Sequence, residues 1–346
     1  MTITPIQSPL TPQVAIPVTP VRPVIPVTPP AAPSIEINSG QVHAQILAQA
    51  TQDAAGRQGG LAPLVADLAQ AARNPNLPTP VRSAAAQVLA QAIPFDARVS
   101  SSDVAKGLSS SGLFLEARLA AQPQVSPLGQ DMKAGLLVLR QALTAWLAGA
   151  PRAPDARNPA RTPPPPYRAS GARAQPAATP SLSADASPSA IGQRLLAETE
   201  AAVARQELLQ IASLPAGEDQ PLEAQVTRWM FEMPFVTPQG ATVAQFEIAR
   251  DGRGSRGEQA EPVWRVGFSI DIEPLGPIHA RVSLSGRQAI VGLWAEQEAG
   301  LARLQADREM LGQALAHADF EAEIALHAGA PRVAPPPTGH LVDQTS

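Results

Sequence analysis

Hydrophobic and polar residues alternate along most of the last third of the chain. In the clearest stretch, residues 264–273, a tryptophan, a valine, a phenylalanine and two isoleucines occupy every second position. Arg265, Ser269 and Asp271 lie between them. A strand has a period of two, so this pattern predicts an antiparallel strand with one buried face. The same pattern predicts strands at residues 226–235, 242–249, 278–284 and 320–326, and the more uniformly apolar residues 289–294 predict an inner strand.

Turns and one helix connect these strands. Residues 274–277 predict a turn, and Gly286 with Arg287 predicts a tight hairpin. Residues 296–317 carry leucines at helical spacing, which predicts one amphipathic helix. The first strand is expected to bury a single face, formed by Trp229, Phe231, Met233 and Phe235. The fold class is therefore α+β: a small C-terminal antiparallel sheet with one long helix, compact from residue 229 to residue 330.

The region upstream is patterned for helices. Residues 41–52, 61–73, 80–93 and 193–213 are rich in helix-forming and apolar residues. The segment from Asp131 is the clearest, because Met132, Leu136, Leu139 and Leu143 recur at steps of three and four. We expect these stripes to pack on each other as a small helical bundle. A docking face for a chaperone or a structural partner is the alternative.

Proline marks the segments between the folded parts, and the chain holds 38 prolines. Residues 1–40 alternate proline with β-branched residues, which predicts an extended polyproline II arm. The arm is either a recognition arm or spacer, or a disordered leader. The expected plan is a proline-rich disordered arm at 1–40, a helical region at 41–150, a Pro/Ala/Ser linker at 151–190, a helix and connector at 191–222, the C-terminal domain at 223–330 and a disordered tail at 331–346.

Composition narrows the classes of partner. The net charge is −4, with 26 basic and 30 acidic residues, which argues against nucleic acid or an anionic membrane as the partner. The chain has no cysteine, so disulfides and thiolate metal sites are excluded. No apolar run is long enough to span a bilayer, and the N-terminus lacks the features of a secretory signal peptide. We therefore expect no membrane insertion.

Several motifs in the sequence bear on possible chemistry. Residues 252–257 match G-x-G-x-x-G, but a strand rather than a helix is predicted after them, so we interpret them as a hairpin loop. The five histidines show no metal-ligand spacing, and each is expected at the surface or at a helix end. Asp271 and Glu273 share a polar strand face, which either supports acid–base chemistry or is simply solvated. No catalytic residue, cofactor or metal is expected, and the chain is not expected to be an enzyme.

The C-terminal block resembles a known family. The residues that carry the resemblance are 229–234 (WMFEMP), 245–248 (QFEI), 264–278 and the step from Ala318 to Phe320. Together they resemble the C-terminal domain of the flagellar hook-length control protein over about 100 residues. Residues 112–116 and 131–140 also resemble the central region of some members.

The resemblance implies a ruler and a signal. Family members are made in the cytoplasm and exported through the flagellar type III apparatus while the hook grows. Their N-terminal half contacts hook and hook-cap subunits. Their C-terminal domain then contacts the export-gate switch protein, and export changes from hook to filament substrates. Residues 1–220, fully extended at about 3.3 Å each, would span roughly 70 nm, which is on the scale of a hook. A monomer is expected.

The resemblance also places the switch contact by position. It falls on a turn and the strand that follows it, at Leu275, Gly276, Pro277, Ile278, Ala280 and Val282. The alternative is that these apolar residues are core. Two other functions stay open: a non-enzymatic adaptor that binds a partner through its proline-rich arm, and a nucleotide-dependent enzyme that would rest on residues 252–257 alone.

Overall fold

The computed structural model describes residues 39–95, 99–121, 130–149, 162–183, 185–215, 226–251 and 262–332. The chain divides into a unit of residues 1–42, of which only the start of α1 is described, and a unit of residues 43–346. Most of the proline-rich arm, the glycine motif at 252–257 and the tail from residue 333 lie outside the described residues. The described helices are α1 (Ser39–Arg57), α2 (Leu61–Ala71), α3 (Thr79–Leu89), α4 (Ser101–Ser110), α5 (Leu115–Ala121), α6 (Met132–Trp146), α7 (Pro188–Ser213) and α8 (Glu298–His317).

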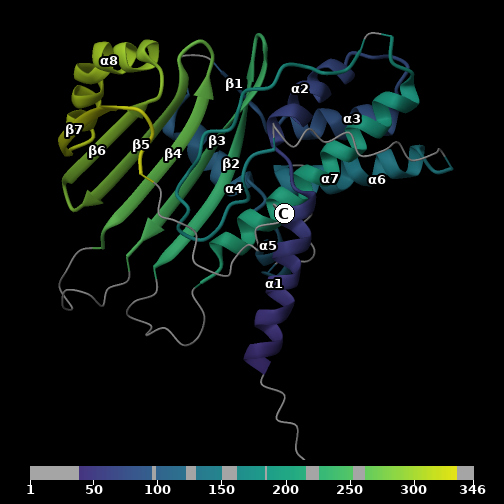
Figure 1. Cartoon of the computed structure of the whole chain (residues 1–346), viewed down its shortest axis with the longest axis horizontal. Coiled ribbons are helices and arrows are strands. Elements are labelled where there is room, and N and C mark those ends of the chain that lie inside the picture. Colours follow the sequence, from purple (N-terminus) through teal and green to yellow (C-terminus); the bar gives the residue numbers. More distant parts are fainter. Residues whose placement is uncertain are drawn as a thin grey trace, which may run out of the picture. The chain divides into compact units, whose positions relative to one another are not determined.

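The strands form one sheet of seven, and their spatial order follows the chain, from β1 to β7 (Figure 1). They are β1 (Ile93–Pro94), β2 (Thr227–Thr237), β3 (Gly240–Arg250), β4 (Trp264–Ile272), β5 (Gly276–Ser285), β6 (Gln288–Ala295) and β7 (Glu321–Ala328). Strands β2 to β6 pair antiparallel, as the alternation predicts. The two outer strands, β1 and β7, pair parallel to their neighbours, so the sheet is mixed.

Strands β2 and β3 are buried on both faces, which differs from the single buried face expected for the first strand. On one face, Phe231, Met233 and Phe246 form a cluster against Val104 and Leu108 of α4. On the other face, α7 packs on Met230 through its own apolar residues, and α2 contacts β3. The sheet therefore forms a central layer between helices at this end.

The helices upstream pack together and also on the sheet. One cluster joins α2, α3, α6 and α7, and it includes Val243 of β3. The apolar stripe of α6 is buried as predicted, at Met132, Leu136, Leu139 and Leu143. Since helices and strands share this cluster, the helical region and the start of the C-terminal sheet are joined by a common core.

At the other end of the sheet, α8 covers one face alone. Leu304, Leu311 and Leu315 of this helix pack on Ala280 of β5 and Leu293 of β6. Figure 1 shows α8 lying over the end of the sheet formed by β5, β6 and β7. The opposite face of the same strands is not covered by a described helix, and this asymmetry positions the site below.

Residues 162–183, which we call the strap, lie within the segment expected to be a linker. Five strap residues are nevertheless buried: Pro163, Pro166, Ser170, Gln175 and Ala178. The backbones of Ala178 and Ala241 exchange two hydrogen bonds of 2.8 Å, and Asp67 of α2 accepts from the hydroxyl of Ser181 at 2.6 Å. These residues of the predicted linker are therefore held in place by partners distant in sequence.

A buried ion pair anchors the start of the strap. Arg205 of α7 is 2% exposed, and its Nε donates to Glu232 of β2 at 2.8 Å. The same guanidinium donates to the carbonyl of Pro164 at 2.7 Å and to the side chain of Gln58 at 2.8 Å. Gln175 adds a second donor to Glu232 at 2.5 Å. Helix, strand and strap thus meet at one charged centre.

Among the described residues no helix is long and apolar enough to cross a membrane.

Candidate functional site

The switch residues inferred from the resemblance lie where the sheet meets α8. Ile278, Ala280 and Val282 all face that helix. Ile278 is 8% exposed and Ala280 2% exposed, and Ala280 and Val282 belong to the cluster under α8. Ile278 and Ala280 are therefore not presented to solvent, whereas Val282 is half-buried.

The turn before β5 packs on the start of α8. Gly276 has φ +75°, a left-handed backbone conformation that favours glycine, and a Cβ there would lie 2.4 Å from the side chain of Gln297. A Cβ on Gly300 would lie 2.7 Å from the carbonyl oxygen of Leu275. Leu275 and Pro277 remain half-buried. The structure thus brings the predicted turn and the helix together through two close backbone approaches.

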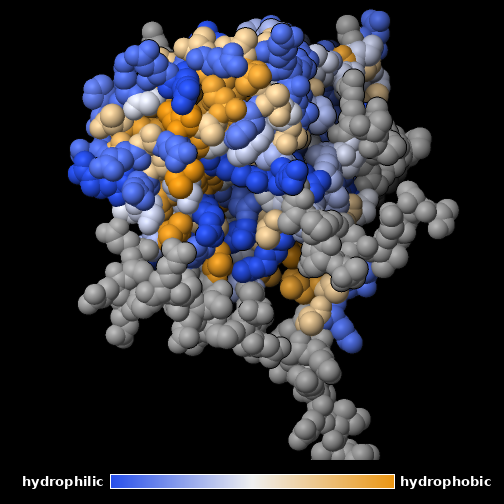
Figure 2. Space-filling model, turned by 60° about the vertical axis from the view of Figure 1, so that its left-hand side comes forward, coloured by the Kyte–Doolittle hydropathy of each residue, from blue (hydrophilic) through white to orange (hydrophobic). Residues whose placement is uncertain are grey.

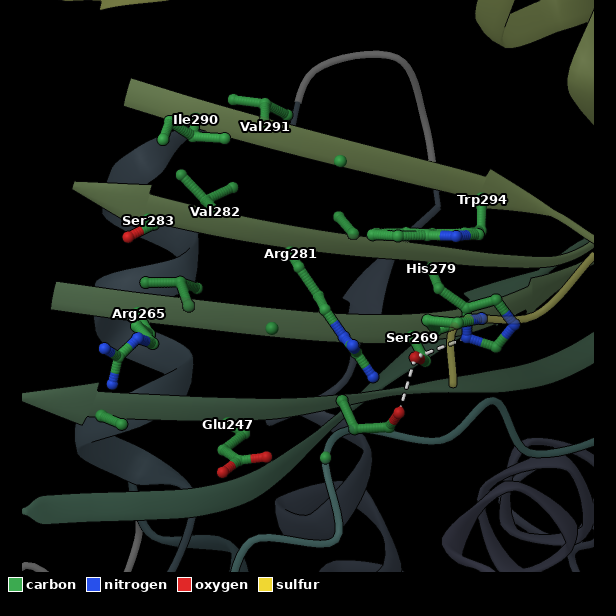
Figure 3. Close-up of a pocket in the computed structure, with 18 of the residues that line it drawn as sticks. Glu247, Arg265, Ser269, His279, Arg281, Val282, Ser283, Ile290, Val291 and Trp294 are labelled. Carbon is green, nitrogen blue, oxygen red and sulfur yellow. Dashed lines mark hydrogen bonds between the residues drawn. The ribbon is translucent and has the colours of Figure 1, made fainter. Parts of the chain in front are cut away.

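A hollow lies on the opposite face of the same strands. We call it the groove; it encloses about 590 Å³ between the strap, strands β2 to β7 and the residues that follow β7. Its floor is formed by the side chains of β4, β5 and β6 that point away from α8, and Figure 3 shows several of them projecting from one face of the sheet. In the space-filling view, hydrophilic residues surround a hollow, with hydrophobic residues beside it (Figure 2).

Arginine is the charged residue that dominates the groove. Arg228, Arg265, Arg281 and Arg332 line it, together with one carboxylate, that of Glu247. Arg228 forms an ion pair with Glu247, and Arg265 pairs with Asp251 at 2.6 Å. Burial lowers the pKa of Arg228, and the positive charges of Arg168 and Arg265 lower it further. These guanidinium groups therefore lie close enough to repel one another.

An aromatic cluster forms one side of the groove. The ring of Trp294 stacks on that of His327, with centroids 4.9 Å apart. The guanidinium carbon of Arg281 lies 5.6 Å from the Trp294 ring centroid, a cation–π contact. Arg281 also donates to the carbonyl of Arg332 at 2.8 Å. These two contacts hold Arg281 across the groove. Ile290, which also lines the groove, is 58% exposed.

A chain of hydrogen bonds runs beneath the strap. The hydroxyl of Ser269 donates to the carbonyl of Ala172 at 2.9 Å, and it lies 2.7 Å from Nδ1 of His279 (Figure 3). Because the single hydroxyl proton is used on the carbonyl, Nδ1 must donate to Ser269. Nε2 of His279 lies 2.9 Å from Oε1 of Glu296, so the network continues from the strap to the residues that follow β6.

The order of serine, histidine and glutamate resembles a nucleophilic triad in outline, but its proton placement is different. A nucleophilic serine gives its proton to the histidine, whereas Ser269 gives its proton to a backbone carbonyl. Ser269 is also 1% exposed. The three side chains therefore fasten the strap to β4 and β5, and they do not form an activated nucleophile.

Other residues singled out in the sequence lie apart from this network. Asp271 is half-buried rather than fully solvated, and burial raises the pKa of its carboxyl. Glu273 is exposed in the turn. His317 lies at the end of α8, as expected. The expectation that each histidine is at the surface or a helix end is wrong for His279, which is 6% exposed, because Ser269 and Glu296 take both of its ring nitrogens. His43 and His340 carry no described side chain.

The sequence pattern did not reveal the groove. Its arginines lie at polar positions of four separate segments, and each one alone resembles an ordinary surface residue. Only the strand register places Arg281 beside Gly292 and Arg265 beside Ser283.

Residues 252–332 match the family model described as flagellar hook-length control protein FliK. The match confirms the resemblance of the C-terminal block and supports a role in flagellar hook-length control. It covers β4, β5, β6, α8 and β7, and hence the predicted switch turn and most of the groove floor. No curated protein and no solved structure matches the chain.

Proposed function

We propose that this protein controls flagellar hook length as a secreted ruler, and that its C-terminal domain triggers the change of export from hook to filament substrates. The observation that carries the proposal is the match of residues 252–332 to the hook-length control family model. In this proposal the N-terminal region contacts hook and hook-cap subunits. The C-terminal domain contacts the export-gate switch protein, and the chain acts without catalysis.

The geometry suggests how the switch residues act. Ala280 and Val282 pack under α8, and Ile278 is buried on the same strand, so we infer that their part in the switch is to hold the turn and helix in register. Leu275, Pro277 and Val282 are the half-buried members of the set, and of these only Val282 belongs to the cluster under α8. We therefore assign the direct partner contact to the turn, with the strand behind it in a positioning role.

The test is a genetic one in the source bacterium. Deleting residues 229–330 should give overlong hooks that lack filaments, scored by electron microscopy and by immunoblots of secreted filament protein. Normal filaments in that strain would contradict the proposal. Because this deletion also removes β2 and β3, which share a core with the helices, a point variant is needed as well.

Leu275→Asp addresses the turn alone. We expect it to leave the thermal unfolding midpoint close to that of the unmodified protein and to delay or abolish the switch. Glu273→Gln, at an exposed position of the same turn, is the matched control and should switch normally. A different result would favour the adaptor function: removal of residues 1–40 abolishes function, while Leu275→Asp leaves export specificity unchanged.

A further inference from the structure

The groove carries a charge opposite to that of the whole protein. The chain has a net charge of −4, whereas the groove lining holds four arginines and one glutamate. Glu247 is already paired with Arg228. Among the described residues, no carboxylate forms an ion pair with Arg281 or Arg332. Among the described residues, Arg281 and Arg332 thus line the groove without an ion-pair partner, beside Arg265, which pairs with Asp251.

We propose that the groove binds an extended acidic segment of a partner protein, whose carboxylates pair with Arg281, Arg265 and Arg332 and whose apolar side chain packs on Ile290 and Trp294. The inference goes beyond the proposed function, because it names a surface and a ligand chemistry. It does not require the partner to be the export-gate protein.

The carboxylate preference follows from how Arg281 is held. Its contact with Trp294 and its bond to the carbonyl of Arg332 fix the guanidinium across the groove. A Cβ on Gly171 of the strap would lie 3.9 Å from a terminal nitrogen of Arg281, so the strap approaches it from the other side. A guanidinium held in place loses less conformational entropy when it binds a carboxylate with two parallel hydrogen bonds. Figure 3 shows the side chain of Arg281 extending from β5 toward β4.

The apolar contact favours a peptide with alternating side chains. Ile290, at 58% exposure, lies on the same face of β6 as Trp294. Side chains of an extended peptide also alternate, so acidic residues can face the arginines while apolar residues contact Ile290 and Trp294. The groove therefore offers arginines that can pair with carboxylates and a small apolar surface that can contact an apolar side chain, and peptide-binding sites commonly combine the two.

Single-stranded nucleic acid is the other polyanion to consider, and the aromatic residues disfavour it. Such sites stack bases on free aromatic faces. Trp294 is the lining residue with the largest ring, and it is already stacked on His327 and in contact with Arg281. Bases would have to displace these internal contacts, whereas carboxylates use the guanidinium groups as they stand.

The proposal is tested by fluorescence anisotropy with the full-length protein. The probe is a labelled peptide that alternates glutamate with leucine, and the comparison peptide carries glutamine in place of each glutamate. We expect the acidic peptide to bind and the glutamine peptide to bind at least about tenfold more weakly, as expected for the loss of charge-assisted hydrogen bonds. Raising the salt concentration should weaken the acidic peptide further.

Variants then locate the site. Arg281→Ala and Arg265→Ala should each weaken binding by about tenfold. Arg303→Ala is the matched control, because it removes the same charge from the exposed surface of α8. If Arg281→Ala alters the thermal midpoint, Arg265→Ala, whose side chain is 59% exposed, still decides the question.

Three results would overturn the proposal. Binding that Arg303→Ala weakens as much as Arg265→Ala would indicate a general charge effect. Equal binding of the acidic and glutamine peptides would remove the role of the arginines. A labelled single-stranded oligonucleotide that binds in the groove while the acidic peptide does not would assign the site to nucleic acid. A normal hook phenotype in Arg281→Ala leaves the peptide measurement intact, so this inference and the proposed function can fail separately.

Discussion

The hydroxyl of Ser269 lies 2.7 Å from Nδ1 of His279 and donates its proton to the carbonyl of Ala172 in the strap. This pairing joins β4 and β5 to a segment of the strap, and Ser269 and Ala172 are 97 positions apart in the chain. It explains why a proline-rich stretch is ordered here. Backbone and side-chain partners distant in sequence replace the regular ladder that a strand would have.

Ser269→Ala tests the contribution of this network. The change leaves the carbonyl of Ala172 and Nδ1 of His279 without a partner in a buried place, so the free energy of unfolding should fall by about 1–3 kcal/mol. Ser283→Ala, half-buried on the same face, should change it by no more than about 0.5 kcal/mol. Urea unfolding measures both. Equal effects of the two variants would show that the network adds no stability of its own.

Glu198 of α7 predicts a dependence of stability on pH. Burial and, to a smaller extent, the charge of Asp67 raise the pKa of its carboxyl, Arg194 offsets part of the shift, and the resulting pKa is about 8. The protonated form is favoured in the folded state. Its contribution is therefore fully present below about pH 4.5 and is lost as pH rises through about 8.

Glu198→Gln should remove this dependence. The amide stays neutral, so the variant should be more stable than the unmodified protein at pH 8, by an amount on the order of 4 kcal/mol at most. Below pH 5 the two should differ little. Glu207→Gln on the same helix, which loses only a 3.7 Å surface pair with Arg57, should leave the pH profile unchanged. Thermal unfolding between pH 5 and 8 decides between these results.

The buried pair of Arg205 and Glu232 predicts a non-additive response. Arg205→Met leaves Glu232 as an uncompensated buried charge and should cost about 3–5 kcal/mol. Combining it with Glu232→Leu should cost clearly less than the sum of the two single changes. A double-mutant cycle by urea unfolding measures the coupling. Strict additivity would mean that the two charges do not act as a pair.

Gly240 controls how closely the strap approaches β3. A Cβ at this position would lie 2.1 Å from the carbonyl oxygen of Ala178, which is backbone and has little freedom to move. Gly240→Ala should therefore release this part of the strap and speed its cleavage by a protease. Gly267→Ala is the matched control, because its nearest neighbour would be at an ordinary 3.7 Å. Limited proteolysis followed by mass spectrometry reports cleavage between residues 162 and 183.

The strands and α8 could be predicted because their side chains follow regular periods. The alternation of residues 264–273 and the leucine spacing of α8 gave bounds close to those observed. The double-sided burial of β2 could not be read in the same way. In the local pattern Glu232 marks a solvent face, yet it is 1% exposed, because Arg205 supplies its counter-charge from a helix that the local pattern does not reveal.

The strap and the groove were missed for a related reason. From composition alone, a proline-rich segment is expected to be unable to bury apolar surface. In the strap, however, the carbonyl oxygens of Pro163 and Pro164 accept hydrogen bonds from the side chains of Gln58 and Arg205. The groove arises from register: arginines on separate strands come together only after the sheet is assembled. The parallel pairing of β7 likewise depends on the direction in which α8 returns the chain.

The strand order has a mechanical consequence. From β2 to β6 each strand pairs antiparallel with the next strand in the chain. A force that pulls on the chain ends would open such hairpins like a zipper, with ladder bonds breaking one after another. Strand β7 runs parallel to β6 after the α8 crossover, so the same force would load all bonds between β6 and β7 together, in shear. Resistance to pulling within the sheet is therefore concentrated at its last strand, inside the segment that matches the hook-length control family.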